Sequence, residues 1–211
     1  MTCSRQDKIA QIIAIGKRLG IRNYSPGYSG NISARCGSNI IITTSGSSSG
    51  FLSEKDFVEI DFNGVPLDSF KKPSSEKLLH LAFYKKRTDI NCVIHVHPAG
   101  LSAFAAAGKD LMQPVMPENI FYFGGIPLAP YTLPSSRELA EKTSLFFADY
   151  DAVLMENHGV IIGSDSLEDA YQKLEIAEEY AKTIIFAQVL GGVKQLSDKD
   201  VQEIMELKLS S

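Results

Sequence analysis

The sequence lacks the features that mark secreted, membrane-bound and nucleic-acid-binding proteins. It has only three cysteines, Cys3, Cys36 and Cys92, without Cys-x-x-Cys spacing, which argues against a disulfide framework and for a reducing compartment. No apolar run approaches transmembrane length, and the N-terminus lacks the apolar core of a signal peptide. The net charge is −4 and there is no basic tract, which disfavours nucleic acid or an anionic membrane as a partner. We therefore expect a cytoplasmic protein.

The composition that is present is that of an ordinary globular domain. The chain has 211 residues, of which 44% are hydrophobic and 22% charged, enough for a substantial core and typical of a soluble protein. The sequence shows neither an internal repeat nor a low-complexity linker. Residues 1–211 are therefore expected to form a single domain.

Hydrophobic periodicity predicts helices and strands that interleave without a strict βαβα rhythm. Helices are expected at residues 5–19, 74–86, 99–107 and 135–148, from Ser166 to the glycines at 191 and 192, and from Ser197 onward. Strands are expected at residues 39–44, 57–62, 91–97, 152–155 and 160–162. Asn63-Gly64 indicates a hairpin turn, and Ser135-x-x-Glu138 indicates a capping box. This order favours an α/β fold in which helices cover a mixed, largely antiparallel central sheet.

Three of the four histidines stand where a metal ion would need them. His95 and His97 lie in an apolar run, and alternation along a strand points both side chains to one face, with Cα atoms roughly 6.5 Å apart. His158 stands between two further apolar runs and would join them from a distant turn. Buried imidazoles need partners, which a metal supplies, although histidines can also share a strand face by chance. Three protein ligands with one open position are the usual plan of a catalytic zinc.

Three other segments and the fourth histidine each admit a structural and a functional interpretation. Pro73-Ser-Ser-Glu76 is either an ordinary helix start or a helix N-terminus that binds phosphate while its glutamate reaches the metal or a substrate proton. Gly30-Asn31 and Ser45-Gly46 are either turns or sources of backbone donors for an anion. His80, one helical turn beyond Glu76, is either a structural histidine or a neighbour of the metal ligands. The residues alone leave these alternatives open.

Six short motifs follow one another along nearly the whole chain: Gly30-Asn-Ile-Ser-Ala-Arg35, Thr44-Ser-Gly46, Pro73-Ser-Ser-Glu76, His95-Val-His97, Ala129-Pro-Tyr131 and Asn157-His-Gly159. In this order and at these separations they resemble the class II aldolase and adducin-head family. Each motif is short, but the ordered set is specific. The family often has Thr-Gly where this chain has Ser45-Gly46, a conservative departure because the hydroxyl remains.

The resemblance implies a three-layer class II aldolase-like fold and one Zn²⁺ per subunit. The ion would be held by His95, His97 and His158, with Glu76 close enough to coordinate it in the empty site. The resemblance also implies a phosphate pocket made by six residues: Gly30, Asn31, Ser45, Gly46, Ser74 and Ser75. Family members assemble as ring-like homotetramers with the site at a subunit boundary, so the same assembly is expected here.

The resemblance further implies an aldolase that cleaves a ketose 1-phosphate, with L-fuculose 1-phosphate as first choice. The products would be dihydroxyacetone phosphate and L-lactaldehyde. Zinc would stabilise the enediolate that remains when the C3–C4 bond breaks, and Glu76 would move protons at its carbon or oxygen.

The chain departs from the family pattern in the group that would protonate the leaving alkoxide. Residues 205–211 contain no tyrosine, and the remaining candidates are Glu118, Tyr122 and Tyr131. Related methylthioribulose-1-phosphate dehydratases use a carboxylate in about the region of Glu118, so this dehydratase is the alternative activity, together with other sugar-phosphate lyases and epimerases of the family. The epimerases carry aspartate where this chain has Glu76, which disfavours that branch. A non-catalytic, adducin-like interaction module is disfavoured because all three histidines are present.

Overall fold

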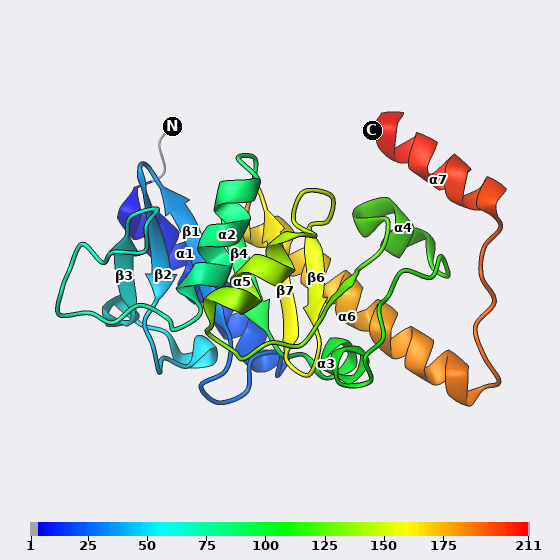
Figure 1. The fold of residues 1–211 in the computed structure, drawn as a ribbon, viewed down its shortest axis with the longest axis horizontal. Helices are drawn as coiled ribbons and strands as arrows, with labels where there is room; N and C mark the ends of the chain where they lie inside the picture. The colour runs from blue at the N-terminus through cyan, green and yellow to red at the C-terminus, as the bar shows by residue number, and fades with distance from the viewer. Residues whose placement is uncertain (1–3, 211) are drawn as a thin grey trace.

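Helices and short strands follow one another irregularly along the chain, as the sequence predicted (Figure 1). The computed structural model describes residues 4–210. In chain order its elements are α1 (Arg5–Ile21), β1 (Asn31–Cys36), β2 (Asn39–Thr43), η1 (Ser49–Phe51), η2 (Glu54–Asp56), β3 (Phe57–Ile60), α2 (Lys77–Lys86), β4 (Cys92–Val96), α3 (Ala99–Ala106), α4 (Pro117–Phe123), β5 (Leu128–Ala129), α5 (Arg137–Ser144), β6 (Ala152–Met155), β7 (Gly159–Ser164), α6 (Leu167–Val189) and α7 (Asp198–Ser210). The short elements η1 and η2 are 3-10 helices.

Across residues 4–210 the strands form one seven-stranded sheet in the order β3-β2-β1-β4-β7-β6-β5. Neighbouring strands are antiparallel except β5 and β6, which are parallel, so the predicted mixed, largely antiparallel sheet is confirmed. β4 lies in the middle of the sheet, where His95 pairs with Asn31 of β1 on one side and with Ile161 of β7 on the other.

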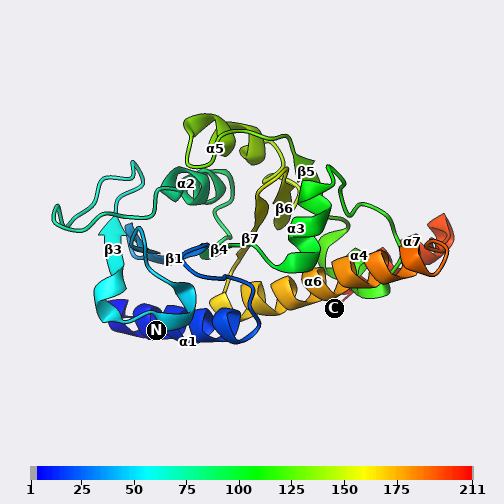
Figure 2. The same ribbon diagram turned by 90° about the horizontal axis from the view of Figure 1, so that it is seen from below.

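Side chains of the sheet alternate between two hydrophobic cores, one on each face. Ile94 and Val96 of β4 pack with α1, α3 and α6, whereas Val93 packs with α2 and α5. Figure 2 shows these two layers of helices on opposite sides of the sheet. By the same alternation His95 lies on the face that α2 covers. The predicted single-domain α/β fold, with its three layers, is therefore confirmed, and it places His95 near the start of α2.

The structure corrects the prediction at two helix starts. α2 begins at Lys77 rather than at residue 74, and its N-cap is Glu76, so the two serines before it are not helical. α5 begins at Arg137, and its cap is Ser136, whose hydroxyl accepts a hydrogen bond from Leu139 N at 3.0 Å. The capping box predicted at Ser135 is wrong, because this residue has left-handed backbone geometry with φ 66°.

Five elements were not predicted: β1, α4, β5 and the two 3-10 helices η1 and η2. β1 begins at Asn31, for which a turn was one of the two interpretations. The turn at Asn63-Gly64 is followed by an isolated bridge between Ile60 and Pro66 rather than by a full hairpin strand. Short or polar strands escape periodicity analysis because they offer too few apolar residues to show alternation.

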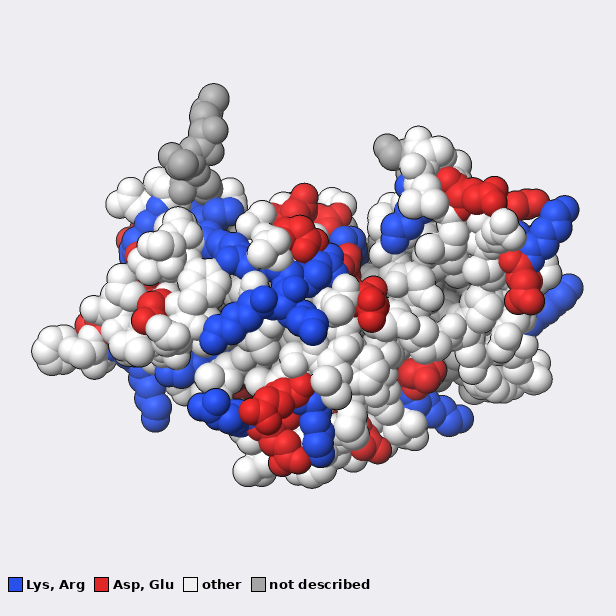
Figure 3. Space-filling view, turned by 45° about the horizontal axis from the view of Figure 1, so that its top comes forward, with Lys and Arg blue, Asp and Glu red and all other residues white. Residues whose placement is uncertain are grey.

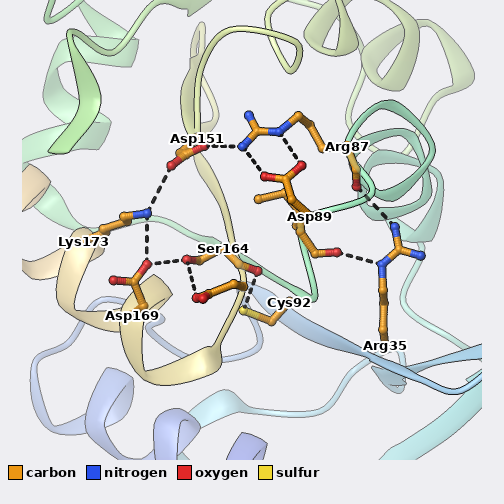
Figure 4. Close-up of polar contacts among 10 residues, drawn as sticks. Arg35, Arg87, Asp89, Cys92, Asp151, Ser164, Asp169 and Lys173 are labelled. Carbon is orange, nitrogen blue, oxygen red and sulfur yellow. Dashed lines mark hydrogen bonds and ion pairs between the residues drawn. The ribbon is translucent and has the colours of Figure 1, made fainter. Parts of the chain in front are cut away.

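A network of ion pairs closes the end of the sheet at which β4 begins (Figure 4). Lys173 lies 3.1 Å from Asp151 and 2.9 Å from Asp169, while Arg87 lies 2.6 Å from Asp89 and 3.1 Å from Asp151. The network joins the end of α2, the start of β6 and the first turns of α6. β4 therefore starts beside this network and ends at the histidines.

Basic and acidic side chains lie in alternating small patches on the face drawn in Figure 3. Some form pairs between elements, such as Arg18 of α1 with Glu168 of α6 at 2.6 Å and Arg5 of α1 with Glu59 of β3 at 2.5 Å. Within residues 4–210, no helix combines the length and the apolar character needed to cross a membrane.

Candidate metal and phosphate site

Two strand ends and one helix start bring four polar side chains together. His95 lies in β4, His97 directly after it, His158 in the turn between β6 and β7, and Glu76 at the N-cap of α2. The centroids of the three imidazole rings are 4.7, 4.8 and 5.2 Å apart. One nitrogen atom of each ring lies within 4.8 Å of the other two. The structure thus brings together the residues that the sequence indicated as metal ligands.

The hydrogen bond of His95 Nδ1 determines whether the Nε2 atom of the same ring can bind a metal. Its Nδ1 lies 2.9 Å from the carbonyl oxygen of Val160, and because a carbonyl only accepts, Nδ1 carries the proton. The lone pair of a neutral His95 is then on Nε2, which lies 2.9 Å from Oε2 of Glu76 without the angle of a hydrogen bond. Metal-binding histidines are commonly oriented in this way by a backbone carbonyl.

The glycine after His158 is required by a close approach. A Cβ atom on Gly159 would lie 2.3 Å from Cδ2 of His97 and 2.6 Å from the carbonyl oxygen of Val96. Asn157 adopts left-handed backbone geometry with φ 54°, a conformation that asparagine tolerates better than most residues. The Asn157-His-Gly159 turn therefore fits around the ring of His97.

Four buried polar atoms at this centre find no hydrogen-bond partner among the described residues: Glu76 Oε1, His95 Nε2, His97 Nε2 and His158 Nδ1. Such atoms are normally paired in folded proteins. In a tetrahedral site with zinc–nitrogen bonds of about 2.0–2.1 Å, the nitrogen atoms lie roughly 3.3 Å apart, so small movements would close these rings on one ion. Imidazole nitrogens and a carboxylate are donors that Zn²⁺ accepts. The residues present therefore fit a metal ion.

Burial and charge set the protonation states at the centre. Burial, followed by the charge of neighbouring imidazoles, lowers the pKa of His97 to about 3 and that of His158 to about 4. Burial lowers the pKa of His95 too, but the facing Glu76 carboxylate outweighs it and the net shift is upward. Burial alone would raise the pKa of Glu76, yet His95, His158 and Asn31 together hold it below its ordinary value. At neutral pH His97, His158 and Glu76 thus have the deprotonated forms that bind metals.

A cavity of about 210 Å³ opens beside these side chains. It is lined by Glu76, His97 and His158 and by all six residues predicted for the phosphate pocket: Gly30, Asn31, Ser45, Gly46, Ser74 and Ser75. Gly30 and Gly46 have φ of 77° and 78°, which favours glycine, and a Cβ on Gly30 would lie 2.8 Å from the carbonyl oxygen of His95. The structure therefore places the predicted phosphate residues directly against the histidine centre.

Sequence reasoning missed other residues that line this cavity: Tyr28, Ser29, Thr44, Ser47, Pro134 and Ser135. Thr44 belongs to a motif that we had singled out, and its place before Ser45 could have indicated it. Ser135 reaches the cavity through its left-handed backbone geometry, which no local pattern announced.

The three acid candidates do not line this cavity within the described part of the chain. Glu118, in the first turn of α4, lines a separate cavity of about 490 Å³ together with Arg22 and Tyr24. Tyr122 and Tyr131 are partly exposed, and the backbone N–H of Tyr131 donates to Glu156 at 2.9 Å. A single chain therefore does not bring these groups to the histidines.

A buried carboxylate of α6 holds the helix that follows His97. Glu178 is 1% exposed and accepts hydrogen bonds from the backbone N–H groups of Gly100 and Leu101, each at 2.9 Å. These groups belong to the first turn of α3, which begins two residues after His97. The chain leaving the metal centre is thus fixed at once to α6.

Comparison of the sequence with known proteins gives close relatives along most of the chain. The model of the Class II Aldolase and Adducin N-terminal domain matches residues 10–185. An L-fuculose phosphate aldolase of Methanocaldococcus jannaschii is 39% identical over 172 residues, which cover 82% of this chain and 92% of that protein. A 3-oxo-tetronate 4-phosphate decarboxylase of Haemophilus influenzae is 31% identical over 198 residues, covering 92% and 93%.

Solved structures give the same answer at the level of the fold. An L-fuculose 1-phosphate aldolase superposes with a TM-score of 0.90 at 28% identity and covers 98% of both chains. YgbL of Klebsiella pneumoniae superposes with a TM-score of 0.89 at 26% identity, covering 95% of this chain and 99% of its own. With the family model, these relatives and the geometry in agreement, the chain belongs to the class II aldolase and adducin N-terminal domain family.

Proposed function

We propose that this protein is a zinc-dependent aldolase that cleaves L-fuculose 1-phosphate into dihydroxyacetone phosphate and L-lactaldehyde. Class II aldolases are metal-dependent, and members of this family act on phosphorylated sugars. The observation that carries the proposal is the direct contact between unpaired histidine and glutamate atoms and a cavity lined by glycine, serine and asparagine. The 39% identity with an L-fuculose phosphate aldolase supports the choice of sugar.

The loops around the cavity supply the donors that a phosphate needs. Backbone N–H groups near Gly30 and Gly46 and the hydroxyls of Ser45 and Ser75 border the space. Lysine and arginine are absent from the described lining residues, so the phosphate would be held by neutral donors, as at glycine-rich loops and backbone nests. The phosphorylated end of the sugar would then lie at the loops and its ketone at the histidines.

Glu76 would handle the proton of the reaction. A zinc ion held by His95, His97 and His158 would act as a Lewis acid for the negative charge that develops on the substrate as its carbon–carbon bond breaks. As the aldehyde forms, its hydroxyl oxygen loses a proton; Glu76, once protonated, would deliver a proton to the carbon from which the aldehyde departs, so that none is gained or lost overall. Asn31 holds this carboxylate through a hydrogen bond of 3.1 Å from its Nδ2 to Oε2. Both side chains are largely withdrawn from solvent, since Glu76 is 7% and His95 0% exposed.

Decarboxylation of 3-oxo-tetronate 4-phosphate is the second candidate reaction. It is supported by the 31% identity with such a decarboxylase across 92% of this chain. Both reactions break the bond to the carbon next to a ketone, and after protonation both leave dihydroxyacetone phosphate. They differ in whether an aldehyde or carbon dioxide departs, which is decided at the end of the cavity away from the phosphate.

The test is to offer each substrate to the purified, zinc-loaded protein with and without a chelator. Dihydroxyacetone phosphate is measured by a coupled reduction, and aldehyde and carbon dioxide are measured separately. Chelator-sensitive release of lactaldehyde from L-fuculose 1-phosphate is the expected result. Release of carbon dioxide from 3-oxo-tetronate 4-phosphate alone would favour the second candidate. Inactivity on both substrates would contradict both assignments and direct the assay to methylthioribulose 1-phosphate.

We also propose that the active form is a homotetramer. Glu118, Tyr122 and Tyr131 lie outside the cavity of their own chain, so the group that takes the proton from the hydroxyl that becomes the aldehyde would come from a neighbouring copy. Light scattering coupled to size-exclusion chromatography checks the assembly, and a monomer with full activity would contradict it.

A further inference from the structure

A row of polar side chains leads from Glu76 into the core beneath α2. Glu76, His80 and Tyr84 are spaced four residues apart and therefore share one face of the helix. Asn31 and Ser33 of β1 are two residues apart and share one face of the strand. The neighbours of Ser33 in β1, at positions 32 and 34, pack in the opposite core, so the polar face of β1 is the face that α2 covers.

The two rows form one continuous chain of hydrogen bonds. Tyr84 Oη lies 2.8 Å from Ser33 Oγ, which lies 2.7 Å from His80 Nδ1. His80 Nε2 is hydrogen-bonded to Asn31 Oδ1, and Asn31 Nδ2 lies 3.1 Å from Glu76 Oε2. Ser33 and His80 are 0% exposed. The sequence assigned roles to Glu76 and Asn31, left His80 between a structural histidine and a neighbour of the metal ligands, and indicated none for Ser33 or Tyr84.

Chemistry fixes the direction of every donor in the chain. A carboxylate only accepts, so Asn31 must present its amide N–H₂ to Glu76 and its carbonyl oxygen to His80. That carbonyl also only accepts, so His80 must carry its proton on Nε2. The Nδ1 atom of His80 is then an acceptor, which receives the hydroxyl proton of Ser33. The hydroxyl of Tyr84 in turn donates to Ser33.

The proton on His80 Nε2 reinforces the orientation that the Glu76 carboxylate requires of the Asn31 amide. If the amide flipped, its carbonyl oxygen would face the Glu76 carboxylate, and its N–H₂ would face the Nε2 proton. Both contacts would be repulsive in a buried site, where such contacts are strong. In the observed orientation the amide N–H₂ donates to Glu76 and the amide carbonyl oxygen accepts from His80.

We propose that His80 is a positioning residue: it holds the Asn31 amide in the orientation that binds the carboxylate of Glu76 at the metal centre. Asn31 also lines the phosphate cavity, so the chain joins the group that moves the proton to the wall of that cavity. The part of the proposal that concerns proton transfer rests on the proposed function. The part that concerns orientation does not.

The orientation is tested in the metal-free wild-type protein by nitrogen NMR. The chemical shifts of the two ring nitrogens distinguish the Nε2–H from the Nδ1–H tautomer. Burial, followed by the charge of His95, lowers the pKa of His80 to about 3, so the ring is neutral at pH 7. We expect the Nε2–H tautomer at pH 7. The Nδ1–H tautomer would overturn the proposal, whether or not the protein cleaves any sugar.

Two substitutions of His80 separate positioning from mere packing. His80→Leu removes both nitrogen atoms, whereas His80→Gln offers one donor and one acceptor in the same direction. We expect His80→Leu to weaken Zn²⁺ binding and to lower kcat by about 10- to 100-fold each with KM little changed, the scale seen when partners of metal ligands are removed. His80→Gln should restore most of both losses. Titration of Zn²⁺ against a chromophoric chelator measures the first effect without any substrate.

Thr143→Val is the matched control. Thr143 lies in α5, is 0% exposed, and its hydroxyl has no hydrogen-bond partner among the described residues. The variant should bind Zn²⁺ and turn over like the wild type. If His80→Leu unfolds at a lower temperature yet binds Zn²⁺ normally, its role is structural and the proposal is wrong. If wild-type protein cleaves no substrate while the tautomer and the Zn²⁺ losses are as expected, the proposed function fails and the positioning role stands.

Discussion

The contact between Gly159 and His97 gives a direct test of the metal ligands. In Gly159→Ala the added Cβ would lie 2.3 Å from Cδ2 of His97. Carbon atoms rest at about 3.5–4.0 Å from one another, so the ring must move by more than about 1 Å. A zinc–nitrogen bond is about 2.0–2.1 Å long, and metal sites tolerate errors of about 0.5 Å. The substitution should therefore remove His97 from the ion.

We expect the Kd for Zn²⁺ to rise by at least about 100-fold, which is about 2.8 kcal/mol at 1.4 kcal/mol per factor of ten. Removal of a residue that merely orients a metal ligand already lowers metal affinity by about 10- to 100-fold, and loss of the ligand itself should cost at least as much. The assay titrates metal-free Gly159→Ala with Zn²⁺ in competition with a chromophoric chelator. Thermal unfolding without metal is recorded beside it.

Gly37→Ala is the control for this experiment. Gly37 lies in the turn between β1 and β2 with φ 59°, and nothing lies within 4 Å of its missing Cβ. Alanine there adds backbone strain without touching a histidine, so Zn²⁺ affinity should not change. Wild-type affinity in Gly159→Ala would refute the assignment of His97 as a ligand. An equal loss in both variants would show that general destabilisation, rather than displacement of the ring, is responsible.

Three further predictions concern the proton-transfer group, the phosphate pocket and the ion-pair network. Glu76→Gln should lower kcat by about 10²-fold or more with KM nearly unchanged, because a positioned acid–base group contributes at least that much; a near-normal rate would assign proton transfer elsewhere. Ser75→Ala should raise KM by roughly tenfold or more, the value of a hydrogen bond to a charged group, and an unchanged KM would place the phosphate elsewhere. Burial raises the pKa of Asp169, but Ser164 and Lys173 outweigh it, so the pKa lies below its ordinary value. The contribution of the Asp169 carboxylate to the free energy of unfolding is therefore present above about pH 4 and is lost as pH falls through the folded-state pKa of Asp169. Asp169→Asn should flatten the acid limb of the plot of unfolding free energy against pH, and an unchanged limb would contradict this role.

Alternation along β4 was sufficient to predict that His95 and His97 share a face, because the period of a strand is a local property. The start of α2 was predicted three residues early, since Ser74 and Ser75 form a normal helix start by local rules. In the structure they line the cavity instead, and Glu76 takes the cap position without capping the helix with its side chain. The error therefore falls at the candidate site, where side-chain groups face the cavity rather than the helix.

β1 was missed for a related reason. Its polar residues Asn31 and Ser33 look like loop residues, yet each has a partner on α2, about fifty positions away in sequence. The sequence pattern of one segment cannot predict such a hydrogen bond, because it depends on where the fold places the partner residue. The same holds for Gly159, whose requirement depends on the position of the His97 ring.

The carboxylate of Glu178 has a consequence for where an anion can bind beside His97. The start of α3 lies beside His97, and a free helix N-terminus there would attract an anion. Glu178 instead accepts hydrogen bonds from the N–H groups of Gly100 and Leu101, and its carboxylate is itself paired with Lys182 at 3.4 Å. The first turn of α3 therefore offers an anion no free N–H group at Gly100 or Leu101. The helix start beside His97 is thus part of the support of the metal centre rather than a second anion site.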